Sequence, residues 1–395
     1  MRTETISYFI STPTELISTV IHHHLSLGQT FSLWKLPHAT EINLIVSDEA
    51  PVEIDEVNME ESVPGFVIAP FHPQKKKIFL KATHRYTFKG SEILKNGDPL
   101  SEEEVDMMKE SKSESDAFHR KEYKKIQQAA ANEYVKLVNK SIELIEEGLF
   151  EKIVPSRTRQ IELPDSFDEV KLFLKLIDKY PHALVSLVSS PETGTWLGAT
   201  PELLVCTDRN AHFKTVALAG TQPYHSSIDV RSVAWTQKDI EEQALVCRYI
   251  ISCFKKIRLR EYDEHGPKTI VAGNVLHLKT DYYVDMNATG FPQLGSIMLK
   301  LLHPTSAVCG MPLQNALDFL QKEEGYDREF YSGFIGPVNI DNESHIYVNL
   351  RCMQILKDKK AHLYAGAGVT ADSIPEKEWE ETEIKMNTLL NVING

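Results

Sequence analysis

The 395-residue chain contains few cysteines, no excess of basic residues and no long apolar run. Its five cysteines are odd in number and scattered within apolar segments, which predicts reduced, buried thiols and not a disulfide framework or a zinc site. The formal net charge of -13 leaves no positive excess to neutralise phosphates, which argues against a general nucleic-acid-binding protein. No stretch approaches the length of a membrane span, and the first residues show no signal-peptide pattern. These absences predict a cytoplasmic protein that binds neither nucleic acid nor membranes.

What is present is typical of a globular protein with mixed secondary structure. Apolar residues make up 42% of the chain and charged residues 25%, and there is no internal repeat. Strand-like runs and helical patterns alternate irregularly, without a βαβ rhythm, which predicts an α+β fold. Hydrophobic spacing predicts helices near 126–147, 167–179, 238–254 and 314–321, strands at 31–36, 42–46, 65–70, 183–188, 213–218 and 271–278, a turn at 198–201, and a hairpin over 331–356.

The last thirty residues carry the densest signal. A Gly-rich turn at 366–368 precedes a helix start, where Ser373 and Glu376 predict a capping box with Pro375 in the first turn. In that helix Glu378 and Glu381 lie three residues apart and Lys385 follows four later, so all three share one face. Such a face is either a solvated surface with an ordinary Glu–Lys pair or a site for a cation and an anion.

A second helix offers a matching acidic pair. Asp239 and Glu242 are also three residues apart, about 140 residues earlier in the chain. If the two helices meet, four carboxylates would repel one another unless a cation lay between them. Mg²⁺ suits such a site because it prefers carboxylate oxygens and retains positions for water and substrate.

Six segments in order resemble the chorismate-utilising enzymes, a family that includes isochorismate synthase, salicylate synthase, anthranilate synthase component I and aminodeoxychorismate synthase component I. They are Lys152-Ile-Val-Pro-Ser-Arg157, Gly198-Ala-Thr-Pro-Glu202, Ala219-Gly-Thr221, Lys238-Asp239 with Glu242, His303-Pro-Thr-Ser-Ala-Val-Cys-Gly310 and 366–385. The resemblance covers residues 125–395, so it implies a catalytic core there and a variable part of the same unit in 1–124. It also implies a large single-domain α+β fold, with antiparallel sheets packed against helices around an active-site cleft.

The resemblance implies roles for individual residues. Lys152 matches the general base that activates water for attack at C2 of chorismate, which requires a neutral amine. Glu202 matches the general acid that protonates the departing C4 hydroxyl, which requires a carboxyl that holds its proton. Apart from the motifs, Lys152 would be an ordinary strand-end lysine and Glu202 a turn carboxylate.

The remaining positions form the expected ligand sites. Glu242 and Glu381 match magnesium ligands, with Asp239 and Glu378 as companions that act through bound water. Chorismate itself is expected to contact His277, Thr221, Ala307, Tyr331, Arg351, Gly366, Gly368 and Lys385, with Tyr331 and Arg351 on opposite strands of the predicted hairpin. The alternatives are a core histidine at 277 and an ordinary cross-strand pair of Tyr331 with Arg351.

Three features favour the isochorismate synthase branch, an isomerase that would supply menaquinone or siderophore biosynthesis. Ala219 replaces the nucleophilic lysine of one type of aminodeoxychorismate synthase, and Ala307 replaces the threonine or serine usual in amine-forming and salicylate-forming relatives. The first hundred residues also lack the Leu-Leu-Glu-Ser element of anthranilate synthases. No glutaminase partner is then expected.

Some positions depart from the family pattern. Gln243, Gln222 and Pro155 stand where histidine, arginine and a non-proline residue are common in relatives, which leaves substrate affinity and pathway open. Salicylate synthase, anthranilate synthase component I and an inactive chorismate-binding protein are the competing hypotheses. The sequence does not determine the oligomeric state.

Overall fold

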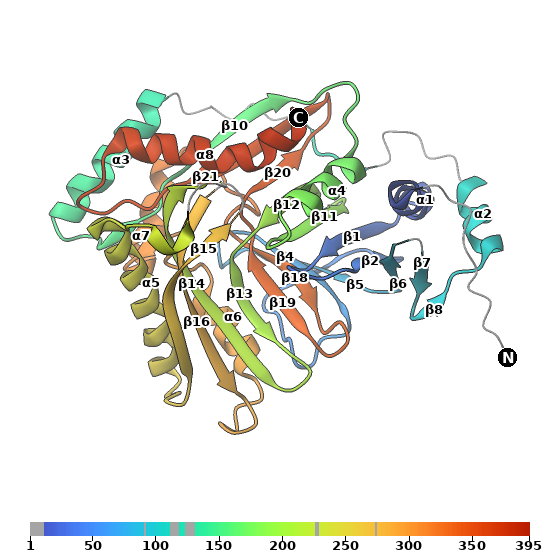
Figure 1. Ribbon diagram of the computed structural model, residues 1–395, viewed down its shortest axis with the longest axis horizontal. Helices are drawn as coiled ribbons and strands as arrows, with labels where there is room; N and C mark the ends of the chain where they lie inside the picture. Colours follow the sequence, from blue (N-terminus) through green and yellow to red (C-terminus); the bar gives the residue numbers. More distant parts are fainter. Residues whose placement is uncertain (1–11, 91, 111–117, 123–130, 226–228, 273–274) are drawn as a thin grey trace.

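The computed structural model describes residues 12–90, 92–110, 118–122, 131–225, 229–272 and 275–395. Two large sheets dominate it, and every pairing between their named strands is antiparallel (Figure 1). The first sheet has the order β10 (Ser156–Glu162), β21 (Lys360–Gly366), β20 (Cys352–Ile355), β12 (Gly194–Thr200), β11 (Leu184–Ser190), β1 (Thr30–Lys35), β2 (Ile42–Ser47), β6 (His84–Lys89), β7 (Glu92–Lys95) and β8 (Asp98–Pro99).

The second sheet has the order β15 (Asp263–Ala272), β16 (Val275–Asp285), β14 (His212–Pro223), β13 (Leu203–Thr207), β19 (Ser344–Val348), β18 (Phe334–Val338), β4 (Gly65–Ala69), β5 (Lys77–Lys81) and β3 (Val52–Ile54). A separate two-stranded ribbon joins β9 (Lys152–Ile153) to β17 (Gly310–Met311). The helices are α1 (Pro13–Ser26), α2 (Glu102–Glu110), α3 (Ala131–Glu146), α4 (Glu169–Lys179), α5 (Gln237–Lys256), α6 (Leu294–Leu302), α7 (Leu313–Glu323) and α8 (Pro375–Ile393), with a 3₁₀ turn at Val230–Ser232.

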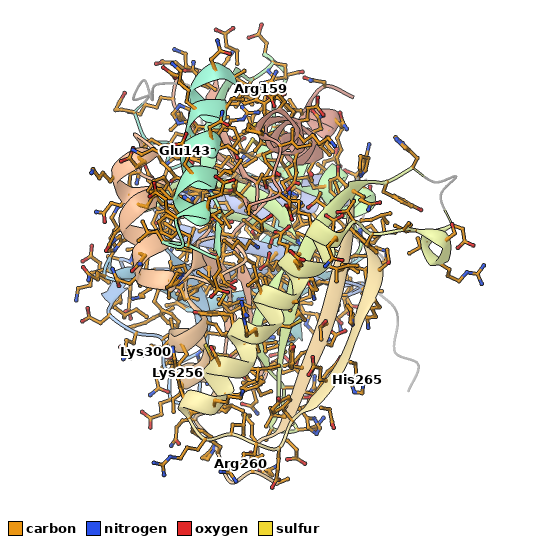
Figure 2. The ribbon with its side chains drawn as sticks, turned by 90° about the vertical axis from the view of Figure 1, so that its left-hand side faces the viewer. Glu143, Arg159, Lys256, Arg260, His265 and Lys300 are labelled. Atoms are coloured by element: carbon orange, nitrogen blue, oxygen red, sulfur yellow. The ribbon has the colours of Figure 1, made fainter. Side chains whose placement is uncertain are left out.

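The two sheets pack face to face, and helices cover their outer faces. An aromatic-rich core that includes Trp34, Phe66 and Trp196 fills the space between the sheets. Alternation along each strand produces this arrangement, because Phe31 and Leu33 of β1 point instead to the core beneath α1, α4 and α8. On the other outer face, α5 and α6 pack on the second sheet, and Figure 2 shows α5 running beside the β15–β16 hairpin.

The strands between residues 30 and 99 belong to both sheets. β1, β2 and β6 to β8 extend the first sheet, and β3 to β5 extend the second. Residues 30–99 therefore pack into the same hydrophobic cores as the strands that follow residue 150. The predicted boundary between 124 and 125 lies within residues 123–130, outside the described part of the chain.

The α+β class is confirmed, and most of the predicted elements are present. The predicted helices correspond to α3, α4, α5 and α7, although residues 126–130 of the first prediction lie outside the described part of the chain. Gly148 adopts a positive φ of 79° just after α3, where a C-terminal cap belongs. Pro155 separates β9 from β10. All five cysteines are free, and no helix in the described ranges is long and apolar enough to cross a membrane.

Four local predictions were wrong. The N-cap of α8 is Ile374, and Ser373 accepts a hydrogen bond from the Thr370 N–H instead of forming a capping box. Residues 198–200 continue β12 and do not form a turn. The predicted strand at 271–278 is the meeting point of two strands, β15 and β16. The hairpin is shorter than predicted: β18 and β19 form it, and β20 crosses to the other sheet.

Candidate active site

A small cavity of about 50 Å³ lies where β14, α5, α8 and the 303–310 segment meet. Many of the predicted site residues line it: Glu202, Thr221, Glu242, His277, Ala307, Tyr331, Arg351, Gly366, Gly368 and Lys385. Lys152, Asp239, Glu378 and Glu381 do not line it. The first three of these four are buried beside the cavity, and Glu381 is half-buried.

Lys152 is completely buried and lies directly behind the cavity wall. Its Nζ donates a hydrogen bond to Glu242 Oε1 at 2.8 Å. Burial raises the pKa of Glu242, but Lys152 and Lys238 outweigh it and hold that pKa at about 2. Gly368 allows this contact, because a Cβ at residue 368 would lie 2.3 Å from Glu242 Oε1. Any residue larger than glycine at position 368 would therefore clash with the carboxylate of Glu242.

The other predicted metal ligands are also held by lysines. Glu378 Oε1 pairs with Lys238 Nζ at 2.5 Å, and Glu381 Oε1 pairs with Lys385 Nζ at 2.6 Å. Burial and the charge of Glu381 raise the pKa of Glu378 to about 7, against the effect of Lys238. Across the described residues, no three histidine, cysteine or acidic side chains converge closely enough to hold a metal ion.

Asp239 caps the N-terminus of α5. Its Oδ2 accepts hydrogen bonds from the backbone N–H and the hydroxyl of Thr236, and its own backbone N–H donates to Thr236 Oγ1, which completes the capping box. Its predicted place beside the magnesium ligands stays a prediction. Lys238, whose role the sequence did not reveal, is the residue that contacts Glu378; its i,i+4 spacing from Glu242 was the available signal.

Glu202 follows β12 at the cavity wall and is 6% exposed. Burial raises the pKa of its carboxyl to about 7, although nearby cations, chiefly Lys152, lower it. A carboxyl with this pKa is partly protonated at neutral pH. It can therefore donate a proton where an ordinary glutamate cannot.

His277 and Arg351 are buried next to each other. His277 Nδ1 lies 2.6 Å from the Gly220 carbonyl oxygen, which only accepts, so Nδ1 carries the hydrogen and Nε2 presents a lone pair. Arg351 Nη2 lies 3.4 Å from that Nε2. Burial and Arg351 lower the pKa of His277 to about 3, so the ring is neutral.

Arg351 is set to bind an anion. It is 9% exposed, and it forms no ion pair with a carboxylate of the described residues. Its backbone has a left-handed φ of 48°, and its carbonyl accepts a hydrogen bond from the Ala199 N–H at 3.1 Å. Tyr331 and Arg351 lie just outside the β18–β19 hairpin, so their predicted place on its strands was wrong. They nevertheless line the same cavity.

The walls of the cavity include residues that sequence reasoning missed: Val154, Leu218, Ser332, Val308 and Leu350. Arg328 holds two of these residues in place. It is buried, and its guanidinium donates hydrogen bonds to the carbonyls of Val154 and Val308. Glu324 accepts from Arg328 Nε at 2.8 Å and also from the Ser156 N–H. The i,i+4 spacing of Glu324 and Arg328 was the available signal for their ion pair, whereas the bonds of Arg328 to backbone carbonyls left none.

Comparison with known proteins assigns the family. The family model described as "Chorismate binding enzyme" matches residues 65–394. The isochorismate synthase EntC of Escherichia coli strain K12 is 31% identical over 249 residues, which cover 61% of this chain and 62% of EntC. The isochorismate synthase DhbC of Bacillus subtilis is 31% identical over 274 residues, which cover 66% of this chain and 67% of DhbC. The chain thus spans less than two thirds of the length of EntC.

A solved structure shows the same fold. MenF, the menaquinone-specific isochorismate synthase of Escherichia coli, superposes with a TM-score of 0.71 at 20% identity over 94% of this chain and 91% of MenF. The family model covers the site residues from Lys152 to Lys385, as well as most of both sheets. This chain therefore belongs to the chorismate-binding enzymes.

Proposed function

We propose that the protein is an isochorismate synthase, an isomerase that adds water at C2 of chorismate and removes the C4 hydroxyl. The observation that carries this proposal is that a buried lysine and a protonatable carboxyl lie near one cavity on separate segments of the chain. Glu202 lines the cavity, and Lys152 is buried beside it. The similarity to EntC and DhbC supports it. MenF is named as menaquinone-specific, and we place the product in menaquinone or siderophore biosynthesis.

The two residues divide the proton transfers. Lys152 is the base that takes a proton from the attacking water, a role that requires the ammonium of its ion pair with Glu242 to lose a proton first. Glu202 donates a proton to the departing hydroxyl, which leaves as water. One water enters and one leaves, so the atoms balance. Arg351 holds a carboxylate of chorismate, and Tyr331 and Lys385 complete that side of the cavity.

The chemistry of three predicted ligands suits a magnesium ion, although their carboxylates are paired with lysines and do not converge in the described residues. Glu242, Glu378 and Glu381 would supply the carboxylate oxygens that Mg²⁺ prefers. The buried Oε2 of Glu378 accepts no well-formed hydrogen bond from the described residues, which is consistent with a place for a cation. Bound Mg²⁺ would neutralise these carboxylates and the ring carboxylate of chorismate. The lysines that now pair with the glutamates would then be released from that role.

Oxygen exchange tests the reaction directly. Because the hydroxyl at C2 comes from solvent, turnover in ¹⁸O-labelled water should give isochorismate that carries one ¹⁸O, detected by mass spectrometry. Isochorismate without the label would exclude water addition and indicate transfer of the original hydroxyl.

The rate should fall on the alkaline side of neutrality. Glu202 acts as an acid only while protonated, and its pKa is about 7, so kcat/KM should decrease above about pH 7 and by roughly tenfold per pH unit beyond it. Measurement from pH 5.5 to 9 checks this. Glu202→Gln should be slow and lack this decrease. A wild-type profile that stays level to pH 9 would contradict the role of Glu202.

Position 307 should influence the product. Ala307 lines the cavity, and a hydroxyl there would resemble relatives that form salicylate. We expect Ala307→Thr to divert part of the product to salicylate and pyruvate, measured by chromatography. Ala307→Val is the matched control, because valine has the shape of threonine without its hydroxyl. Identical product profiles for both variants would show that this hydroxyl does not determine the outcome.

A further inference from the structure

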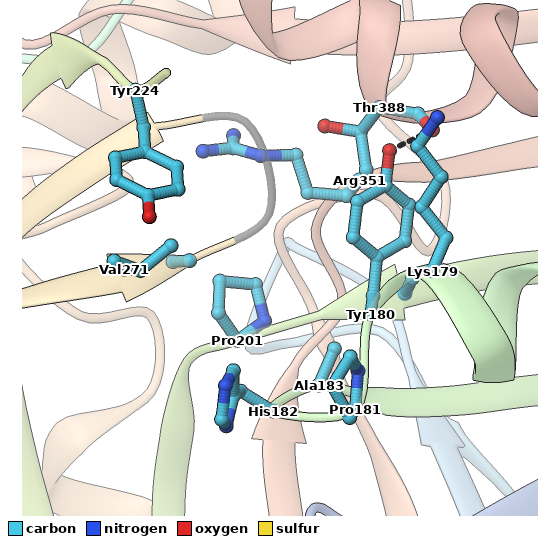
Figure 3. A pocket seen from close by; sticks show the side chains of 12 residues that line it. Lys179, Tyr180, Pro181, His182, Ala183, Pro201, Tyr224, Val271, Arg351 and Thr388 are labelled. Carbon is cyan, nitrogen blue, oxygen red and sulfur yellow. Dashed lines mark hydrogen bonds between the residues drawn. The ribbon is translucent and has the colours of Figure 1, made fainter. Parts of the chain in front are cut away.

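A second and larger cavity lies on the other side of Arg351 (Figure 3). It measures about 320 Å³, and it shares Arg351 and Pro201 with the inner cavity of about 50 Å³. The end of α4, the start of β11, β12 and α8 form one side of it, and the ends of β14 and β15 form the other. Pockets for small ligands usually measure about 300 to 1,000 Å³, so of these two adjoining cavities the outer one has the size of a ligand site and the inner one does not.

The lining of the outer cavity is basic. Lys179, His182 and Arg351 contribute to it, and none of the described lining residues is acidic, although the chain as a whole has a net charge of -13. The carboxylates that influence Arg351 belong elsewhere: Glu202 lines the inner cavity and Glu381 is paired with Lys385. A local excess of positive charge in an acidic protein favours an anionic ligand.

The remaining walls suit a flat ring. Pro181, Ala183, Ala199, Pro201 and Val271 present apolar surface. The hydroxyl of Tyr180 is already bonded to the Thr388 carbonyl oxygen at 2.8 Å, as the dashed line in Figure 3 shows, so this residue offers its ring. Tyr224 faces the cavity from the opposite side (Figure 3). Apolar and aromatic walls with a few convergent cations are typical of a site for a ring that bears a carboxylate.

We propose that the outer cavity binds a ring carboxylate next to Arg351, before or in competition with the inner site. This ring carboxylate is either the substrate on its way to the inner cavity or a separate regulator. Only the first of these rests on the proposed function. In both cases Arg351 is the shared contact, because its backbone is fixed by the hydrogen bond to Ala199 while its guanidinium borders both cavities.

Calorimetry with benzoate tests the site without turnover. Lys179→Glu reverses one lining charge and should weaken benzoate binding roughly tenfold. Lys175→Glu is the matched control, because Lys175 is an exposed lysine one turn earlier on α4 that does not line the cavity. Val271→Trp should fill the cavity and abolish the same binding without changing charge. If benzoate does not bind, or if neither variant weakens its binding, the proposal is wrong.

Kinetics then identify the ligand. If the substrate passes through the outer cavity, Lys179→Glu and Val271→Trp should lower kcat/KM severalfold and leave kcat unchanged. If the ligand is a separate regulator, both variants should keep normal kcat/KM for chorismate and lose inhibition by benzoate. A wild-type protein that turns over no chorismate would overturn the proposed function, whereas the calorimetric result would still decide this site.

Discussion

Replacing Lys152 with alanine should reduce water addition to chorismate by roughly 100- to 10,000-fold, the usual contribution of a general base. The variant removes the amine beside the cavity wall but leaves Arg351 and the carboxylates that would hold magnesium. Binding of chorismate in the presence of Mg²⁺ should therefore persist. Initial rates measure the first effect, and calorimetry measures the second.

Two controls separate loss of the base from loss of structure. Lys152→Gln can still donate a hydrogen bond to Glu242 but cannot accept the proton, so it should be as inactive as the alanine variant. Lys140→Ala removes a lysine from an exposed pair of similar length, Lys140 Nζ to Glu323 Oε2 at 2.7 Å, and should be fully active. Turnover retained in both Lys152 variants would assign the base to another residue.

Replacing Glu242 with glutamine should abolish both activity and the response to magnesium. The change keeps the shape of the side chain but removes the charge that balances Lys152 and that would bind the cation. Mg²⁺ should raise the melting temperature of the wild type and have little effect on the variant, because a ligand stabilises only the state that binds it. Differential scanning fluorimetry with and without EDTA measures this.

The neighbouring glutamate provides the control. Glu241 is exposed on α5 and accepts a hydrogen bond from Gln237, so Glu241→Gln should retain both activity and the thermal response. A normal magnesium-dependent shift in Glu242→Gln would mean that the cation does not bind at Glu242.

Short-range patterns in the sequence predicted much of the fold. Apolar spacing located α5 and β1 because each buries one face against a core. The same patterns failed where two strands follow each other closely. Apolar residues at 271–272 belong to β15 and those at 275–278 to β16, and apolar spacing alone merged them into one predicted strand although Gly-Asn lies between them. After β19 in the second sheet, the chain crosses to the first sheet to form β20. This crossing depends on contacts with strands distant in sequence, which local apolar spacing does not reveal.

The candidate site shows a similar division. Ordered motifs identified residues that line the cavity, such as Glu202 and Thr221. They did not predict how charges pair within it. The i,i+4 spacing of Glu381 and Lys385 indicated their contact, whereas the pairs of Lys152 with Glu242 and Lys238 with Glu378 cross between distant segments. The roles of the fourteen predicted site residues remain predictions until such variants are measured.

The most direct test of the central proposal is the product profile of the purified protein with chorismate. Reactions with Mg²⁺, with EDTA, and with or without ammonium would be separated by chromatography. The account predicts isochorismate alone, lost with EDTA and unaffected by ammonium. Salicylate with pyruvate, or anthranilate formed with ammonium, would contradict the choice of isochorismate synthase within the family. No product under any condition would favour a chorismate-binding protein without activity.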